Sequence, residues 1–120
     1  MAGVPFAHAF REDIIPFSGG WIACSESAKR SIAGLTRGGR PFWVGIASRG
    51  ESGVRNRWNQ KYKALGMKSI AIIYTTSSDK FRKAMEAELC EFFEGHTDNL
   101  VRGGGGPRGT SPYAVYVAWA

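Results

Sequence analysis

A chain of 120 residues is long enough for one domain with a modest hydrophobic core and too short for two. Its hydrophobic content of 43% and aromatic content of 12% exclude a disordered chain, and two cysteines are too few for a disulfide scaffold or a cysteine-rich zinc site. Sixteen Lys and Arg residues against ten Asp and Glu give a formal net charge of +6, which favours a polyanionic partner, nucleic acid ahead of an anionic membrane.

The N-terminal residues lack the charged-then-apolar pattern of a secretion signal, and no apolar run approaches the length of a membrane span. We therefore expect no membrane segment and an intracellular protein, cytoplasmic or nuclear. Residues 1–19 are expected to form an N-terminal lead, and residues 20–120 a single domain.

The first half of the predicted domain alternates between short strands and helices. Residues 21–24, which follow a Gly-Gly turn, predict a short strand, and Ser25 to Ser27 offer a cap for a helix that ends at Leu35. The β-branched and aromatic residues of 42–48 predict a buried strand, and a helix is expected from about residue 54 to 65.

The second half continues the alternation. Residues 69–75 form a continuous β-branched run that suits the centre of a sheet, and apolar residues at helical spacing predict a helix over 80–94. Residues 113–119 alternate like a last strand. The order predicts an α/β (α+β) fold, in which helices pack on a mixed sheet of three to four strands.

Basic residues concentrate in one part of the chain. Between Arg37 and Lys68 lie eight of the sixteen basic residues and one acidic residue, Glu51. Such a segment can neutralise phosphates and stack bases, but a solvated basic surface around a core tryptophan has the same pattern, and both interpretations stay open. The side chains that we expect on nucleic acid from this pattern, and from the later glycine run with its flanking arginines, are Arg49, Arg55, Trp58, Lys63, Arg102 and Arg108.

The helix predicted over 80–94 carries carboxylates near its apolar positions. Glu88 lies three residues after Met85, so we expect it to point into or beside the core-facing stripe, whereas Glu86 lies further round the helix. An inward glutamate is either half-buried and salt-bridged, or a metal ligand or general base in a cleft. In the second interpretation, Arg57 from the basic segment is the available partner.

These residues, taken in order, resemble the GIY-YIG endonuclease superfamily. Residues 42–48 are similar to the second strand of that family with its YIG-x-[ST] ending, and Arg57 corresponds to the arginine on the helix that follows. Residues 84–88 resemble the helical pattern that ends in the catalytic glutamate, and Asn99 resembles the asparagine after it, which we count among the residues on nucleic acid. The nearest match to the family's first strand, which forms a hairpin with the second, is residues 20–22.

The resemblance implies single-metal hydrolysis of phosphodiester bonds in DNA or RNA, with DNA favoured. Either Glu88 or Glu86 would hold Mg²⁺ or Mn²⁺, and Arg57 would stabilise phosphate charge in the transition state.

Trp43 stands where the family has a tyrosine, and an indole cannot exchange a proton as a phenol does. Trp43 would then stack a base or fill space, and Lys61 or Tyr62 would supply the acid or base group. Two further hypotheses stay open: a non-catalytic relative that binds nucleic acid, and a module that docks a protein through Trp and Phe surfaces.

Overall fold

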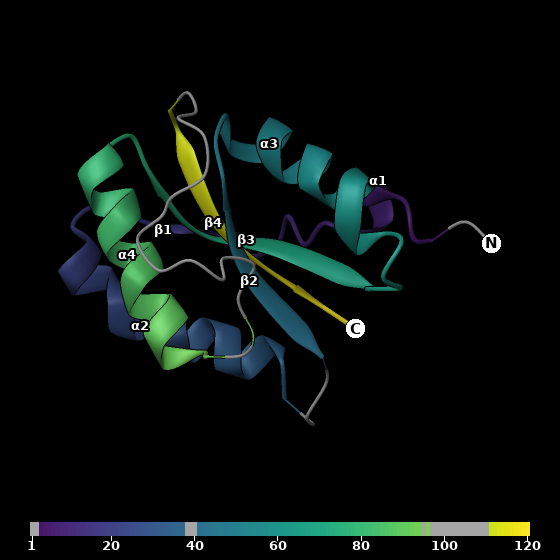
Figure 1. Ribbon diagram of the computed structural model, residues 1–120, viewed down its shortest axis with the longest axis horizontal. Coiled ribbons are helices and arrows are strands. Elements are labelled where there is room, and N and C mark those ends of the chain that lie inside the picture. Colours follow the sequence, from purple (N-terminus) through teal and green to yellow (C-terminus); the bar gives the residue numbers. More distant parts are fainter. Residues whose placement is uncertain (1–2, 38–40, 95, 97–110) are drawn as a thin grey trace.

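The structure is a computed structural model that describes residues 3–37, 41–94, 96 and 111–120. A four-stranded sheet, with the strand order β1-β3-β4-β2, lies between two layers of helices (Figure 1). This mixed sheet with helices packed on it confirms the predicted fold class. The elements are, in chain order, α1 (Phe6–Ala9), β1 (Phe17–Ser18), α2 (Trp21–Leu35), β2 (Phe42–Ala47), α3 (Gly50–Arg57), the π-helix η1 (Trp58–Tyr62), β3 (Ser69–Thr76), α4 (Asp79–Phe92) and β4 (Tyr113–Trp119).

Strand β4 occupies the interior of the sheet although it comes last in the chain. It pairs antiparallel with β2 on one side and with β3 on the other, so that Tyr116 lies opposite both Gly45 and Ile72. Every residue from 114 to 119 is buried. The alternating apolar side chains of this strand therefore serve two cores, one on each face of the sheet.

Different helices pack over the two cores. On one face, α1, α3 and η1 pack on the sheet, and on the other face α2 and α4 do so (Figure 1). The first core contains Phe6, Val54, Trp58, Tyr62, Ile70, Ile72 and Tyr116, and the second contains Ala28, Ile32, Ile73, Met85, Leu89, Val115 and Val117. The sheet thus separates side chains on α3 from side chains on α4.

The predicted strand at residues 21–24 is wrong, because these residues form the first turn of α2. Trp21, Cys24, Ala28 and Ile32 recur at three- and four-residue steps and pack on one core, which is a helical pattern. The antiparallel partner of β2 is β4, so residues 20–22 do not supply the hairpin strand that the resemblance implied.

Parts of the N-terminal lead belong to the fold, which corrects the predicted boundary at residue 20. Phe6 and Ala9 of α1 are buried in a core, and Phe10 forms a bridge with Ile70. Strand β1 pairs parallel with β3 at the edge of the sheet, with Phe17 opposite Tyr74. Burial of Phe6 and Ala9 removes apolar surface from water on this face of the sheet.

Helix α3 begins at Gly50, four residues before the predicted start, because glycine at position 53 allows a close approach to β2. A β-carbon on Gly53 would lie 1.8 Å from the carbonyl oxygen of Ser48, so the segment 50–53 coils directly beside the strand end. The helix then widens into η1, where the Lys63 amide donates to the Trp58 carbonyl at 2.9 Å. The other predicted strands and the helix over 80–94 match β2, β3, β4 and α4 to within two residues.

No helix in the described part of the chain is both long and apolar enough to cross a membrane.

Two helical glycines give a matched pair of substitutions. We expect Gly53→Ala to lower the free energy of unfolding by roughly 1–3 kcal/mol, because the added methyl group overlaps the Ser48 carbonyl. Gly34→Ala in α2 meets nothing within 4 Å and should raise the free energy of unfolding by roughly 0.5–1 kcal/mol. Urea titration of both variants measures the difference, and a stable Gly53→Ala protein would contradict the close packing of α3 on β2.

Candidate functional site

The exposed side of α3 and η1, with the turns at either end, is strongly basic. Residues 49–68 contain six basic residues and one acidic residue, Glu51. Glu51 reaches Arg55 at 4.0 Å, and both side chains are more than half exposed, so this pair neutralises little of the charge. We call this surface the basic face; its cations are Arg49, Arg55, Arg57, Lys61, Lys63 and Lys68, of which Lys61 and Lys63 are partly buried.

The helices on the other face of the sheet carry balanced charge. Together α2 and α4 contain five basic and five acidic residues. Several of these form ion pairs: Lys29 reaches Glu88 at 2.5 Å and Glu26 at 3.1 Å, and Asp79 accepts hydrogen bonds from Arg82. The hydrogen bond from Lys29 to Glu88 raises the pKa of the lysine. Among the helices that the structure describes, net positive charge is therefore concentrated on one side of the sheet.

Trp58 and Tyr62 do not stack bases, because both side chains are fully buried. The Trp58 indole nitrogen donates to the Val4 carbonyl at 2.7 Å, and the hydroxyls of Tyr62 and Tyr116 lie 2.9 Å apart. The prediction that Trp58 contacts nucleic acid and that Tyr62 exchanges a proton with a substrate is wrong. The alternative of a core tryptophan agrees with the burial of Trp58.

Trp43 and Lys61, by contrast, are brought together. The Lys61 ammonium lies 5.3 Å from the centre of the Trp43 ring, across the gap between β2 and η1. Trp43 is partly buried and packs on the core that α3 covers. Trp43, Lys61 and Arg57 therefore belong to the same side of the sheet.

The two candidate glutamates differ in burial, and Glu86, which was expected further round the helix, is the more buried one. Glu86 is 4% exposed, and both of its carboxylate oxygens are buried without a hydrogen-bond partner. Glu88 was expected into or beside the core-facing stripe; its side chain is 37% exposed and paired with Lys29, which is the half-buried, salt-bridged alternative. Helix α4 turns Met85, Glu86 and Leu89 inward, so Glu88 falls at the margin beside α2.

The structure does not bring Arg57 together with either glutamate. Arg57 is exposed on α3, which packs on one face of the sheet, whereas Glu86 and Glu88 lie on α4 at the other face (Figure 1). The cation beside Glu86 is Arg82, one helical turn earlier, which is 6% exposed and lies 4.9 Å from the centre of the Tyr113 ring. Arg82 was not counted among the predicted site residues, although its four-residue spacing from Glu86 places the two on one helix face.

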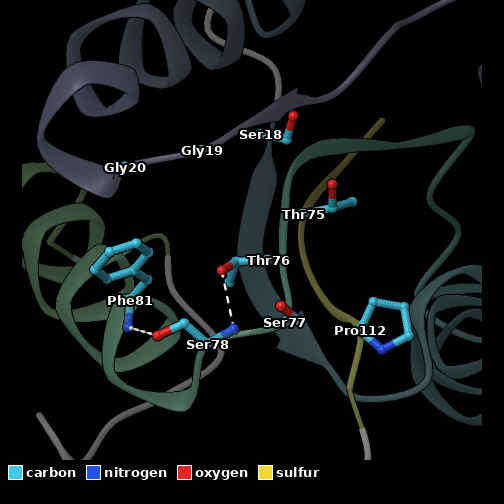
Figure 2. A pocket seen from close by; sticks show the side chains of 9 residues that line it. All are labelled: Ser18, Gly19, Gly20, Thr75, Thr76, Ser77, Ser78, Phe81 and Pro112. Atoms are coloured by element: carbon cyan, nitrogen blue, oxygen red, sulfur yellow. Dashed lines mark hydrogen bonds between the residues drawn. The ribbon is translucent and has the colours of Figure 1, made fainter.

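A pocket of about 450 Å³ lies elsewhere, where β1 and β3 end and α2 and α4 begin. Figure 2 shows that Ser78 caps α4: its hydroxyl accepts from the Phe81 amide at 3.1 Å, and the Thr76 hydroxyl accepts from the Ser78 amide at 3.1 Å. The polar side chains around it are all hydroxyls, and none of the predicted site residues lines it. These hydroxyls are Ser18, Thr75, Thr76, Ser77 and Ser78.

Of the two predicted metal ligands, Glu86 is the one whose carboxylate oxygens have no hydrogen-bond partner among the described residues. A buried carboxylate without partners fits a cation ligand, and one carboxylate can suffice for Mg²⁺ when phosphate and waters complete its shell. Glu88 already contacts Lys29. No group of three or more His, Cys, Asp or Glu that could hold a metal occurs among the residues that the structure describes. The predicted nucleic-acid contacts Asn99, Arg102 and Arg108 lie outside those residues.

Comparison with protein-family models, with curated proteins and with solved structures finds no match for this chain. The resemblance to the GIY-YIG superfamily therefore stays a prediction from the motifs.

The unpaired carboxylate of Glu86 makes stability depend on pH. Burial raises the pKa of Glu86 above its ordinary value of 4.5, and the charge of Arg82 acts in the opposite direction. The folded protein then holds this proton more tightly than the unfolded chain does. The contribution of Glu86 to stability is fully present below pH 4.5 and is lost as the pH rises through the folded pKa.

We expect Glu86→Gln to raise the free energy of unfolding at pH 7 by roughly 1–3 kcal/mol, because a neutral amide costs less to bury than a carboxylate. The gain should shrink toward pH 4.5, where wild-type Glu86 is protonated. Urea titrations between pH 4.5 and 8 measure this trend. The matched variant Glu88→Gln loses the pair with Lys29 and should be destabilised by less than about 1 kcal/mol. A Glu86→Gln effect that does not change with pH would contradict the assignment.

Proposed function

We propose that this domain binds nucleic acid through the basic face. The observation that carries the proposal is the charge asymmetry across the sheet: residues 49–68 hold five net positive charges, while α2 and α4 together hold none. Glu51 is the one acidic residue within 49–68, and its pair with exposed Arg55 is long, at 4.0 Å, so it neutralises little of the charge there. A polyanion is the partner that such a surface attracts over distance and holds in contact.

The arrangement of the cations suits a phosphate backbone. Arg55 and Arg57 are exposed on α3, and Arg49 and Lys68 extend the positive surface at the two ends of the helical segment. Arginine donates in a planar fork that matches phosphate oxygens, and lysine adds a compact charge. Sequence-independent contacts of this kind give affinity that falls steeply with salt.

Removal of two cations from the basic face tests the proposal. We expect Arg55→Ala/Arg57→Ala to weaken binding to a DNA duplex several-fold at 50 mM salt and to reduce the slope of log affinity against log salt by about two. Fluorescence anisotropy over a salt series measures both quantities. The matched control Arg30→Ala/Lys80→Ala removes the same charge from exposed positions on α2 and α4 and should change the slope little.

Equal losses in the two double variants would show that net charge, and not the basic face, drives binding. An absence of binding to DNA and RNA at low salt would overturn the proposal and favour the protein-docking module.

A second candidate function is divalent-metal-dependent hydrolysis of a phosphodiester bond at Glu86. The observation that favours it is the pair of buried carboxylate oxygens without partners, which a cation would satisfy. Glu86 would hold Mg²⁺ or Mn²⁺, and the metal would stabilise charge on the phosphate. Arg82, rather than Arg57, is the cation whose charge acts on this carboxylate.

The hydrolytic hypothesis predicts a difference between two neighbouring glutamates. With Mg²⁺ or Mn²⁺ present, nicking of supercoiled plasmid should fall at least about 100-fold in Glu86→Gln and change less than about threefold in Glu88→Gln. Plasmid without added metal and with EDTA is the control for contaminating nuclease. Absence of nicking by the wild-type protein in either metal would leave a binding domain without catalysis, and equal activity in both variants would exclude Glu86.

A further inference from the structure

The carboxamide side chains of the chain are concentrated on the basic face. The sequence contains three asparagines and one glutamine, and three of these four residues are Asn56, Asn59 and Gln60. All three are exposed, and they alternate along α3 and η1 with the exposed Arg55 and Arg57. Asparagine favours helices less than Lys or Glu does. A helix that only needed solubility would therefore not require two asparagines.

Packing determines which side of the helix these residues occupy. Val54, Trp58 and Tyr62 recur every four residues and are fully buried against the sheet. The residues between them, which include all three carboxamides, therefore face away from the sheet. Helix α3 with η1 forms the outer layer of the molecule on this side (Figure 1).

We infer that α3 and η1 act as a recognition helix that enters the major groove of duplex DNA, where Asn56, Asn59 and Gln60 contact base edges. This inference rests on the proposed function and assigns its substrate class. Asparagine and glutamine can donate to and accept from adenine at the same time, and arginine does the equivalent at guanine by donating twice. The exposed side of this helix thus combines the residue types that read bases with those that bind phosphates.

The dimensions of the segment agree with this assignment. Helix α3 contains 8 residues and η1 contains 5, so the continuous helical segment spans more than two turns. A helix with its side chains is about 10–12 Å across, and the major groove of B-form DNA is about 12 Å wide. Arg49 precedes the helix and Lys63 follows it, where the phosphates on either side of a groove would lie.

An RNA duplex does not offer its base edges to a helix in the way that duplex DNA does. The major groove of A-form RNA is deep and narrow, and side chains of a helix cannot read base edges there. A single strand is bound by stacking on aromatic side chains, and the two aromatic residues of the helical segment itself, Trp58 and Tyr62, are buried. Duplex DNA is the nucleic acid whose accessible surface matches exposed carboxamides on a helix.

The test begins with selection of binding sites from random-sequence duplex DNA by the full chain. Anisotropy at fixed salt then compares the enriched duplex with a scrambled duplex, an RNA duplex of the same sequence and the single strands. We expect an enriched motif that is preferred over the scrambled duplex by about 100-fold or more. Methylation of guanine N7 within the motif, which alters only the major groove, should reduce binding by roughly tenfold.

The decisive variant is Asn56→Ala/Asn59→Ala/Gln60→Ala, which keeps every charge of the basic face. It should lose at least about tenfold of the preference for the motif and retain affinity for scrambled duplex within about twofold. Alanine favours helices and the three positions are exposed, so thermal melting should show an intact fold. The variant Arg55→Ala/Arg57→Ala should instead weaken binding to both duplexes.

Two sets of results separate the inference from the proposed function. Salt-dependent binding without an enriched motif, equal affinity for the RNA duplex, or an unchanged preference in the triple variant would overturn the recognition helix and leave the basic face as a sequence-independent surface. Absence of binding to every probe at low salt would overturn the proposed function and this inference together.

Discussion

The structure depends on the insertion of β4 between β2 and β3. This last strand pairs antiparallel with both neighbours and is buried along residues 114–119. Without it, β2 and β3 would have no partner in common, and neither helical layer would have a continuous sheet to pack on. The long separation in sequence between β2 and β4 means that loop closure must precede the contacts that repay it.

The sheet built around β4 also organises the charge of the molecule. Helix α3 and η1 place Val54, Trp58 and Tyr62 in one core and turn cations outward, whereas α2 and α4 pair their charges with one another beside the second core. A surface with unbalanced charge costs stability through self-repulsion unless a counter-charge binds it. The proposed binding of nucleic acid rests on this unbalanced charge of the basic face.

The sequence was sufficient to predict the fold class and the strands β2, β3 and β4, because β-branched and aromatic residues are enriched in strands. It was misleading at residues 21–24, where four apolar or small residues fit a strand and a helix turn equally, and tertiary packing decided for the helix. The basic segment was located correctly, but burial of Trp58 and Tyr62 depends on contacts with Val4 and Tyr116, more than fifty residues away.

The candidate site was harder to predict than the fold for a related reason. Whether Glu86 or Glu88 points inward depends on a rotation of α4 by a fraction of a turn, which apolar periodicity alone does not fix. Lys29, which holds Glu88 at the margin, comes from a helix 59 residues earlier in the chain. Pairing Arg57 with a glutamate required both helices on one face of the sheet, and only the three-dimensional order of the strands settles that placement.

The separation of the two faces has a consequence for any chemistry of this protein. Glu86 and the basic face lie on opposite sides of the sheet, so a nucleic acid bound at Arg55 and Arg57 would not contact that carboxylate. Recognition and hydrolysis, if both occur, then use different parts of the surface and respond to different substitutions. Glu86, buried without a hydrogen-bond partner among the described residues and beside the buried Arg82, is therefore the group on which the hydrolytic hypothesis depends.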